Sequence, residues 1–313
     1  MSPADQNEVR RGTTYGFLAY AIWGVFPLYF HALKPSGAWE ILAHRIVWTL
    51  VLCLAVLGIR RDFGWARQLV ARPRLSLGVT VAALLIAANW VIYVFAVISG
   101  RTTEAALGYF LNPIVTVALG VLVLRERLRP LQWAAVAIGA AAGVYLSVAG
   151  GQFPLIALSL AFSFAGYGLV KKKVGASLEA MHSLAAETAV LFPVAVGVLL
   201  WLSITGGTTF TEDAPLHPLL LLLSGVVSAV PLLLFAAAAR RIPLTTVGLL
   251  QFITPILQLI CGVALLGEHM STERWIGFAI VWVALLMLSV DMVANHPSRR
   301  RRFASPVIEE PAP

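Results

Sequence analysis

Four ionisable side chains lie inside long apolar stretches of the sequence. Three of them, Glu40, His44 and Arg45, share the stretch 38–59. The fourth, Glu187, lies in a separate stretch in the second half of the chain. An ionisable group in an apolar membrane interior costs about 3 kcal/mol or more unless it is paired or wetted. Each of the four is therefore a candidate for binding, gating or ion coupling.

Glu40 and His44 are four residues apart, so they share one face of a helix. Two interpretations of Glu40 remain open. Either it belongs to a gate, or it lies in the first turn of its helix at the outer surface, where the helix N-terminus favours a carboxylate. We favour the second for Glu40. For Glu187 we favour a functional role or a buried ion pair over exposure to lipid.

Two prolines with polar neighbours fall within apolar stretches. Asn112 immediately precedes Pro113, and Thr254 immediately precedes Pro255. A proline within a helix removes one backbone hydrogen bond and frees a carbonyl group one turn earlier, so we expect a helix break at each. Prolines are also common in membrane helices, but the matched surroundings of these two favour a functional break.

Amides and aromatic side chains cluster near the same segments. Asn89 and Tyr93 are four residues apart and share a face. A cavity lined by aromatic rings and a few amides suits a small amphipathic organic solute, although each ring taken singly is more typical of core packing or of an interfacial belt. The predicted substrate-binding residues are Asn89, Tyr93, Tyr109, Asn112, Gln251 and Thr254, and the predicted coupling or gating residues are Arg45, Glu187, Glu40 and His44.

The composition places these residues in a membrane. Of the 313 residues, 59% are hydrophobic and only 12% are charged, and the mean hydropathy is +0.85. These values exclude a soluble domain and a porin-type barrel, whose strands alternate. Runs of about 18 or more apolar residues are typical of membrane helices. We predict an all-α integral membrane protein with ten transmembrane helices, at 15–33, 38–59, 76–98, 103–124, 131–149, 153–170, 181–203, 217–239, 245–266 and 274–293.

The chain contains an internal duplication. Residues 109–133 align without a gap with residues 251–275, 142 positions further on, and eight of the 25 aligned positions are identical. The identities include proline, glycine, glutamate and tryptophan, which a shared apolar composition would not bring into one register. The predicted organisation is a cytoplasmic tail at 1–13, a five-helix repeat at 14–149, a second at 153–293 and a basic cytoplasmic tail at 294–313.

The same offset aligns Arg45 with Glu187, so a buried ion pair between related positions is expected. The alternative is that Arg45 pairs with Glu40 in its own helix and that Glu187 acts alone as a proton site. The duplication also matches Glu126 with Glu268 at the ends of their helices, where a carboxylate opposes the helix dipole. We expect both glutamates to fix loops through nearby arginines.

Basic residues are distributed unequally between the two sides. Of 23 Lys and Arg residues, nineteen fall on one side of the predicted helices and three, Lys34, Arg101 and Arg274, on the other. Positively charged loops stay in the cytoplasm, so both termini are predicted to be cytoplasmic. An odd number of helices per repeat then inverts the second repeat, an arrangement typical of secondary transporters with a midplane site. The basic residues would meet anionic lipid headgroups, which argues against a nucleic-acid partner.

The sequence lacks four short motifs that are typical of catalytic, nucleotide-binding or metal-binding sites. It contains no HExxH, GxSxG, P-loop or CxxC pattern. Cys53 and Cys261 form no disulfide or metal-binding pattern. We therefore expect no catalytic residue, no bound metal and no cofactor.

Several stretches resemble one known family. They are YGFLAYAIWGVFPLYFHALKPSGAWEILAHR at 15–45, the pair Asn89-Trp90, EAALGYFLNP at 104–113 and RERLRPLQW at 125–133. Together they resemble the RarD subfamily of EamA-type transporters, in the drug/metabolite transporter superfamily. The resemblance implies a ten-helix permease of the inner membrane with two EamA repeats and a central cavity. The family label suggests drug export, and the resemblance carries over no catalytic residue.

The resulting hypothesis is a secondary active transporter of small organic solutes that works by alternating access. Its partners would be a small-molecule substrate, membrane lipid, and a coupled proton or counter-substrate, and it would be a monomer or a weak homodimer. A facilitative amino-acid or metabolite transporter is the alternative within transport. A membrane sensor or accessory subunit that moves no solute is the alternative from another class.

Overall fold

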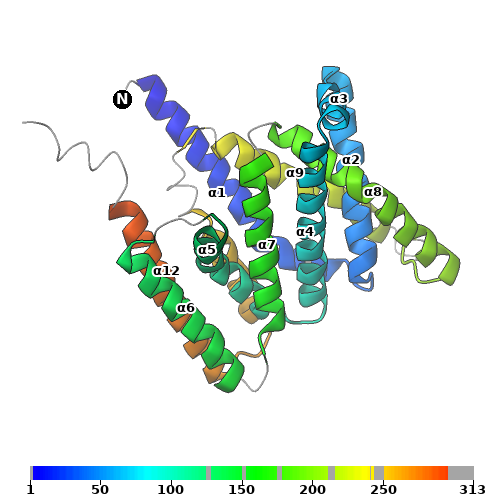
Figure 1. The fold of residues 1–313 in the computed structure, drawn as a ribbon. Helices are drawn as coiled ribbons and strands as arrows, with labels where there is room; N and C mark the ends of the chain where they lie inside the picture. Colours follow the sequence, from blue (N-terminus) through cyan, green and yellow to red (C-terminus); the bar gives the residue numbers. More distant parts are fainter. Residues whose placement is uncertain are drawn as a thin grey trace, which may run out of the picture.

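The computed structural model describes residues 3–124, 128–149, 153–174, 178–210, 216–239, 241–242 and 250–294. Within these ranges all the regular secondary structure is helical (Figure 1). A helix satisfies every backbone hydrogen bond within one segment, which is what a long apolar run needs in lipid. The elements are α1 (Pro3–Ala32), α2 (Ala38–Arg60), α3 (Gly64–Ala71), α4 (Pro73–Ile98), α5 (Thr102–Leu124), α6 (Pro130–Ala149), α7 (Leu155–Val174), α8 (Ala180–Thr205), α9 (Leu216–Ala239), α11 (Ile253–Ile260), the π-helix η1 (Cys261–Leu265) and α12 (Thr272–Ala294).

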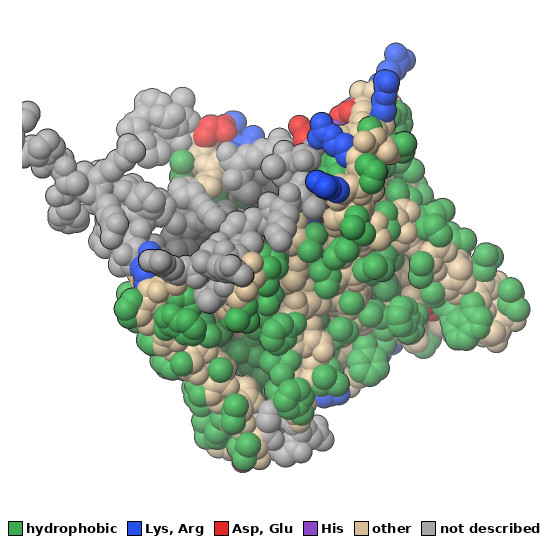
Figure 2. Space-filling model, viewed as in Figure 1, with side chains coloured by type: hydrophobic (Ala, Val, Ile, Leu, Met, Phe, Trp, Pro, Cys, Tyr) green, Lys and Arg blue, Asp and Glu red, His purple; other side chains and the backbone are tan. Residues whose placement is uncertain are grey.

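Five helices of the described residues are long and apolar enough to cross a membrane. They are Ala38–Arg60, Pro73–Ile98, Ala180–Thr205, Leu216–Phe235 and Thr272–Asp291, and shorter apolar helices cover Pro130–Leu146, Leu155–Lys171 and Ile253–Leu265. Large apolar side chains also cover the sides of the bundle (Figure 2). Val148, for example, is 78% exposed and Leu286 is 65% exposed. Apolar surface of this extent fits contact with lipid rather than with water.

The helices pack as a bundle in which distant parts of the chain lie side by side. Helix α2 packs against α8 and α9, α1 packs against α9 and α11, and α5 packs against α7 and α11. Helix α4 packs against α7, and α6 pairs with α12. In Figure 1 the α6–α12 pair lies to the left of α7, while α2, α4 and α8 lie to the right. The buried core therefore forms mainly between the two halves of the sequence.

Glycines permit the closest of these helix contacts. A side chain at Gly225 in α9 would lie 2.4 Å from the backbone of Trp48 in α2. A side chain at Gly108 in α5 would lie 2.8 Å from the carbonyl oxygen of Ala157 in α7. Small residues let membrane helices approach each other until van der Waals contacts hold them. Two of the interfaces between the halves, α2 with α9 and α5 with α7, thus depend on single glycines.

The structure corrects several boundaries. The predicted tail 1–13 is helical from Pro3 onward and continuous with α1. The short helix α3 occupies part of what was expected to be a loop between the second and third spans. The start of the span predicted at 245–266, and all but the first residue of the tail at 294–313, lie outside the described residues.

The two prolines also behave differently from the prediction. Helix α5 runs through Pro113 without interruption, so the helix break expected there is wrong. Pro255 lies in the first turn of α11, just after a turn at 251–252. In a first turn a missing N–H costs nothing, because that group has no partner within the helix anyway.

Candidate functional site

The most unusual buried group is the guanidinium of Arg45. The residue is 3% exposed and lies in the N-terminal half of α2. Its Nε donates a hydrogen bond of 3.0 Å to Ser228 Oγ of α9, while its Nη1 has no hydrogen-bond partner within the described part of the chain. The guanidinium carbon lies 4.5 Å from the centre of the Trp90 ring and 5.0 Å from that of Phe30. Aromatic faces attract a cation, but they do not replace the hydrogen-bond acceptors that its N–H groups need.

Tyrosines and amides continue the site beside Arg45. The Tyr93 and Tyr109 rings meet edge to face, 5.6 Å apart, and the Tyr109 hydroxyl donates to Asn89 Oδ1 at 3.1 Å. The Gln258 amide donates to the Tyr93 hydroxyl at 3.0 Å, and Gln258 Oε1 has no partner among the described residues. Tyr93 also packs on the Phe30 ring, 5.9 Å away, and Phe30 lies against Arg45. We call this set the Arg45 cluster; its members are Phe30, Arg45, Asn89, Trp90, Tyr93, Tyr109, Ser228 and Gln258.

Helical spacing explains how part of the cluster forms. Asn89 and Tyr93 lie on one face of α4, as their spacing of four predicts, and Asn89 also donates 3.1 Å to the Leu160 carbonyl of α7. Tyr109 joins them from α5, and Gln258 joins them from α11. The cluster therefore draws side chains from helices of both halves of the chain. The structure brings together three of the six predicted substrate-binding residues.

The other three predicted residues make contacts elsewhere or lie apart. Thr254 Oγ1 donates to the Tyr20 carbonyl at 2.8 Å, which fastens α11 to α1. Asn112 is buried and accepts a weak bond of 3.4 Å from Thr116 in its own helix. Gln251 is half-buried in the turn before α11. The described contacts do not connect these residues to the Arg45 cluster.

Glu187 belongs to a second polar cluster on a different set of helices. Its Oε1 lies 2.5 Å from Lys171 Nζ of α7 and accepts 2.9 Å from Ser183 Oγ, and its Oε2 accepts 3.2 Å from the Tyr167 hydroxyl. Lys171 also donates to Ser183. The predicted ion pair with Arg45 is therefore wrong, because Lys171 already neutralises Glu187. The alternative of a lone Glu187 is wrong for the same reason.

Glu40 is a buried connector rather than a surface carboxylate. It is 2% exposed, although it lies in the first turn of α2. The loop after α8 donates three hydrogen bonds to it: Thr209 N at 2.8 Å, Thr209 Oγ1 at 2.9 Å and Thr208 Oγ1 at 3.0 Å. His44 stacks on the Phe210 ring of the same loop. The predicted position of Glu40 in the first turn of its helix is thus confirmed, but its carboxylate is buried against this loop and not exposed, and the alternative pairing with Arg45 is wrong.

Glu268 makes a similar connection from the other half of the chain. Its carboxylate accepts hydrogen bonds from the backbone N–H groups of Thr102 and Thr103, at 2.5 and 2.8 Å, at the start of α5. A carboxylate is favourable at a helix N-terminus because of the helix dipole. The expected arginine partner is wrong for Glu268, and Glu126 lies outside the described residues.

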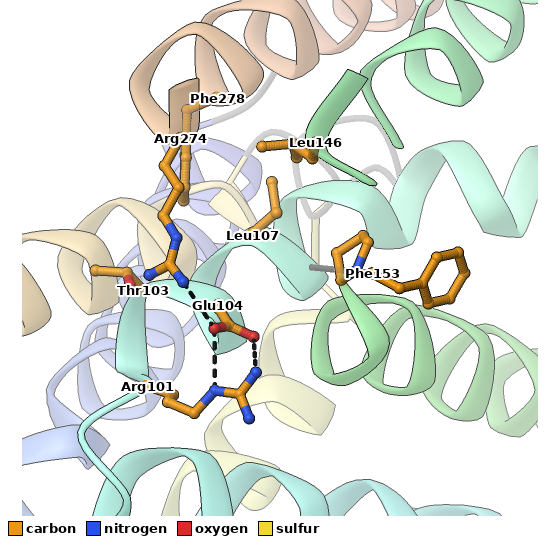
Figure 3. A pocket seen from close by; sticks show the side chains of 9 residues that line it. Arg101, Thr103, Glu104, Leu107, Leu146, Phe153, Arg274 and Phe278 are labelled. Carbon is orange, nitrogen blue, oxygen red and sulfur yellow. Dashed lines mark hydrogen bonds and ion pairs between the residues drawn. The ribbon is translucent and has the colours of Figure 1, made fainter. Parts of the chain in front are cut away.

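A small cavity lies next to this connection. Arg274 donates to Glu104 Oε1 at 3.1 Å, and Arg101 binds both oxygens of the same carboxylate (Figure 3). The cavity holds about 40 Å³. Phe153, Phe278, Leu107 and Leu146 supply apolar walls. Both arginines already bind one carboxylate, and the cavity has room for only a few water molecules, so it is too small for an organic solute.

Sequence reasoning missed Ser228, Gln258 and Lys171. Gln258 follows Thr254 by four residues in an apolar segment, and Ser228 follows Ser224 by four, so a search for polar residues at helical spacing would have found both. Lys171 lies at the end of its span and was counted among the cytoplasmic anchors. Its pairing depends on which helix lies beside α7, which no local pattern reveals.

Comparisons with known proteins fit a membrane transporter. The profile of the EamA-like transporter family matches residues 10–149 and again residues 153–290. The chain is 49% identical over 307 residues to Protein RarD of Streptomyces exfoliatus, covering 97% of this chain and 96% of that one. It is 38% identical to Protein RarD of Escherichia coli K12, over 92% and 97% of the two chains. It is 39% identical to the uncharacterized transporter YojE of Bacillus subtilis 168, over 91% and 96%.

The fold is also similar to that of a solved crystal structure. The TM-score is 0.60 at 16% sequence identity, covering 90% of this chain and 98% of the other. At this identity the similarity concerns the fold alone.

Proposed function

We propose that this chain, which belongs to the RarD subfamily of the EamA-like transporter family, is a secondary active transporter that exports small organic solutes. It is a multi-pass membrane transporter by its family and its apolar helices. The proposal adds its mechanism, its orientation and its solutes. Ten helices in two inverted repeats, with both termini in the cytoplasm, open a central site alternately to each side of the inner membrane.

The pattern of helix contacts supports the repeats. Let α1 correspond to α7, α4 to α9 and α5 to α11. The contact of α1 with α9 then corresponds to that of α7 with α4. The contact of α1 with α11 corresponds to that of α7 with α5. The family profile matches two consecutive segments of similar length, which also supports two repeats. Inverted repeats place the substrate near the midplane, between the halves.

The Arg45 cluster is the observation that carries the proposal. Arg45 and Tyr109 come from the first half of the chain, and Ser228 and Gln258 come from the second. A buried charged group among aromatic rings, drawn from both halves, is what a transported solute would need for recognition in the membrane. Motion of one half against the other would change the shape of this site.

Polar contacts between the halves would have to open and close during the cycle. At one end Glu40 binds Thr209, and Glu268 binds the start of α5. Asp62 binds His182 at 2.8 Å beside the C-terminal end of α2 and the N-terminal end of α8. Contacts of this kind are weak enough individually to exchange during a cycle, because each trades a protein partner for water.

We further propose that Glu187 couples the cycle to protons. Its partner Lys171 is 27% exposed, so water can reach the pair from one side. Protonation of Glu187 would remove the charge that holds Lys171, and α7 and α8 would then separate more easily. A counter-substrate is the alternative means of coupling.

A flux assay tests the transporter function. Purified protein in liposomes, with an imposed pH gradient, should accumulate at least one labelled solute from a panel of amino acids, aromatic carboxylates and chloramphenicol, the drug named for one relative. Liposomes without protein are the control. Movement without accumulation against a gradient indicates a facilitator. Binding without movement of any solute indicates a sensor and contradicts the proposal.

Cysteine labelling tests the orientation. Thr205 at the end of α8 and Arg67 in α3 are both exposed, and the native Cys53 and Cys261 are buried and can be replaced. An impermeant thiol reagent should label the Thr205→Cys variant on intact cells and label the Arg67→Cys variant only after lysis. The reverse pattern would invert the proposed topology.

A further inference from the structure

We propose that the Arg45 guanidinium binds the carboxylate of the solute, and that this solute is a small monocarboxylate with an apolar or aromatic body. The inference rests on the proposed function, because it names the class of solute for the same site. It depends on three features of the Arg45 cluster: an uncompensated charge, unpartnered polar atoms and an aromatic wall.

The first feature is a positive charge without a counter-ion. None of the ion pairs among the described residues includes Arg45. The buried acids that form ion pairs, Glu187, Glu104 and Asp291, have other cations as partners. An isolated charge in an apolar interior is costly, so a protein retains one only where something compensates it. A bound anion would supply the missing charge.

The second feature is a pair of buried atoms without hydrogen bonds. Among the residues that the structure describes, Arg45 Nη1 lacks an acceptor and Gln258 Oε1 lacks a donor. Buried polar atoms are almost always paired in folded proteins, and exceptions point to a ligand or a catalytic role. Both atoms belong to the Arg45 cluster, where Tyr93 touches Gln258 and packs on Phe30, whose ring lies against Arg45. A guanidinium N–H group matches a carboxylate oxygen in both charge and geometry.

The third feature is the aromatic wall. Trp90 and Phe30 lie against the guanidinium, and Tyr93 packs on Phe30 and on Tyr109. These rings partly stabilise the cation while the site is empty, and they leave its edge available for an anion. They also offer apolar surface to the body of the solute, which a fully hydrated inorganic anion would not use.

The single positive charge of the Arg45 cluster limits the class of anion that it can bind. Arg45 is the only basic residue of the cluster, so it neutralises a monoanion and would leave a phosphate dianion with an uncompensated charge. A monocarboxylate attached to an apolar or aromatic body therefore fits the charge and the walls together. Trp90 and Tyr109 are half-buried, whereas Arg45 is buried, so the solute reaches the charge when the two halves move apart.

The test measures binding and stability on the purified full-length protein at constant ionic strength. The probes are monocarboxylates and their neutral amides, beginning with 3-phenylpropanoate and 3-phenylpropanamide. Wild-type protein should be stabilised by at least one carboxylate, as a rise in Tm, and should bind it about ten- to a hundredfold more tightly than its amide. Arg45→Gln should abolish this preference, and Arg45→Lys should retain part of it.

Two control variants separate binding from structure. Arg241→Gln removes an arginine that pairs with Glu8 outside the cluster, and it should leave carboxylate binding unchanged. Lys171→Gln removes a cation that has a counter-ion, so it should lower the Tm of the ligand-free protein. Arg45→Gln should lower that Tm less than Lys171→Gln does, because it removes a charge that has no counter-ion among the described residues. A stability gain from deleting a buried functional charge is a common sign of a ligand site.

Three results would overturn the inference: equal binding of carboxylates and amides, wild-type carboxylate binding by Arg45→Gln, or a loss of Tm in Arg45→Gln as large as in Lys171→Gln. The last would make Arg45 a structural clamp between α2 and α9. Flux of neutral or cationic solutes without carboxylate binding would overturn the inference but keep the transporter. Carboxylate binding through Arg45 without any flux would keep the site and refute the transporter.

Discussion

Helices α2 and α8 pack against each other and carry opposite charges at positions related by the internal repeat, yet the two charges have different surroundings. Glu187 is held by Lys171, Ser183 and Tyr167, so both of its oxygens have partners. Arg45 has one hydrogen bond to Ser228 and otherwise faces aromatic rings. The 142-residue offset aligns these two positions in the sequence, but their partners in the structure differ.

The difference between these two clusters distinguishes a charge with a structural role from a charge that could recognise a solute. A charge that the protein neutralises with its own side chains stabilises a contact between helices. A charge that the protein leaves unpaired is available to something that arrives from outside. This contrast is why we propose proton coupling at Glu187 and solute recognition at Arg45.

The largest expected effect is the loss of the cation at the Glu187 cluster. Lys171→Gln leaves a carboxylate that is 5% exposed without its counter-ion. We expect the free energy of unfolding to fall by about 2–3 kcal/mol, below the range of about 3–5 kcal/mol for a fully buried pair because Lys171 is partly exposed. Unfolding in mixed detergent micelles measures it. A change within experimental error would remove the contrast between the clusters.

A double-mutant cycle sharpens the same contrast. Lys171→Gln and Glu187→Gln should be non-additive, with a coupling energy of about 1–2 kcal/mol, because the two groups touch. Arg45→Gln and Glu187→Gln should be additive within about 0.5 kcal/mol, because their contacts are separate. Strong coupling in the second cycle would restore the ion pair that the sequence repeat suggested.

A smaller effect is expected at the connection between Glu268 and α5. Glu268→Gln keeps the shape but removes the charge that caps the N–H groups of Thr102 and Thr103. The loss should be about 1 kcal/mol, typical of a helix cap. Thermal unfolding followed by circular dichroism measures it. A loss as large as that of Lys171→Gln would show that carboxylates at helix ends matter as much as the buried pair.

The smallest effect is expected at the surface pair of Glu8 and Arg241. Glu8 is about half exposed, and its contact with Arg241 is 3.0 Å. Exposed ion pairs contribute about 0–1 kcal/mol, so Glu8→Gln should change the free energy of unfolding by less than about 0.5 kcal/mol. The same unfolding assay checks this value. A larger loss would mean that simple proximity of charges, and not burial, governs stability in this protein.

Part of the site could be predicted from the sequence. Asn89, Tyr93 and Tyr109 converge as expected, because helical spacing fixes Asn89 and Tyr93 on one face of α4. The partners of Arg45 and Glu187 could not be predicted, because they depend on the rotation of each helix and on which helices are neighbours. Lys171 and Ser228 come from helices that no pattern around Glu187 or Arg45 identifies.

The sequence alone determined the class of the protein, because about 59% hydrophobic residues in long runs leave few solutions other than membrane helices. It also revealed the family through motifs such as Asn89-Trp90 and the segment 104–113. Only the tertiary structure decided which charges are neutralised. Ion pairs and hydrogen bonds form between side chains that are close in space. Along the chain, Lys171 lies 16 residues from Glu187, and Ser228 lies 183 residues from Arg45.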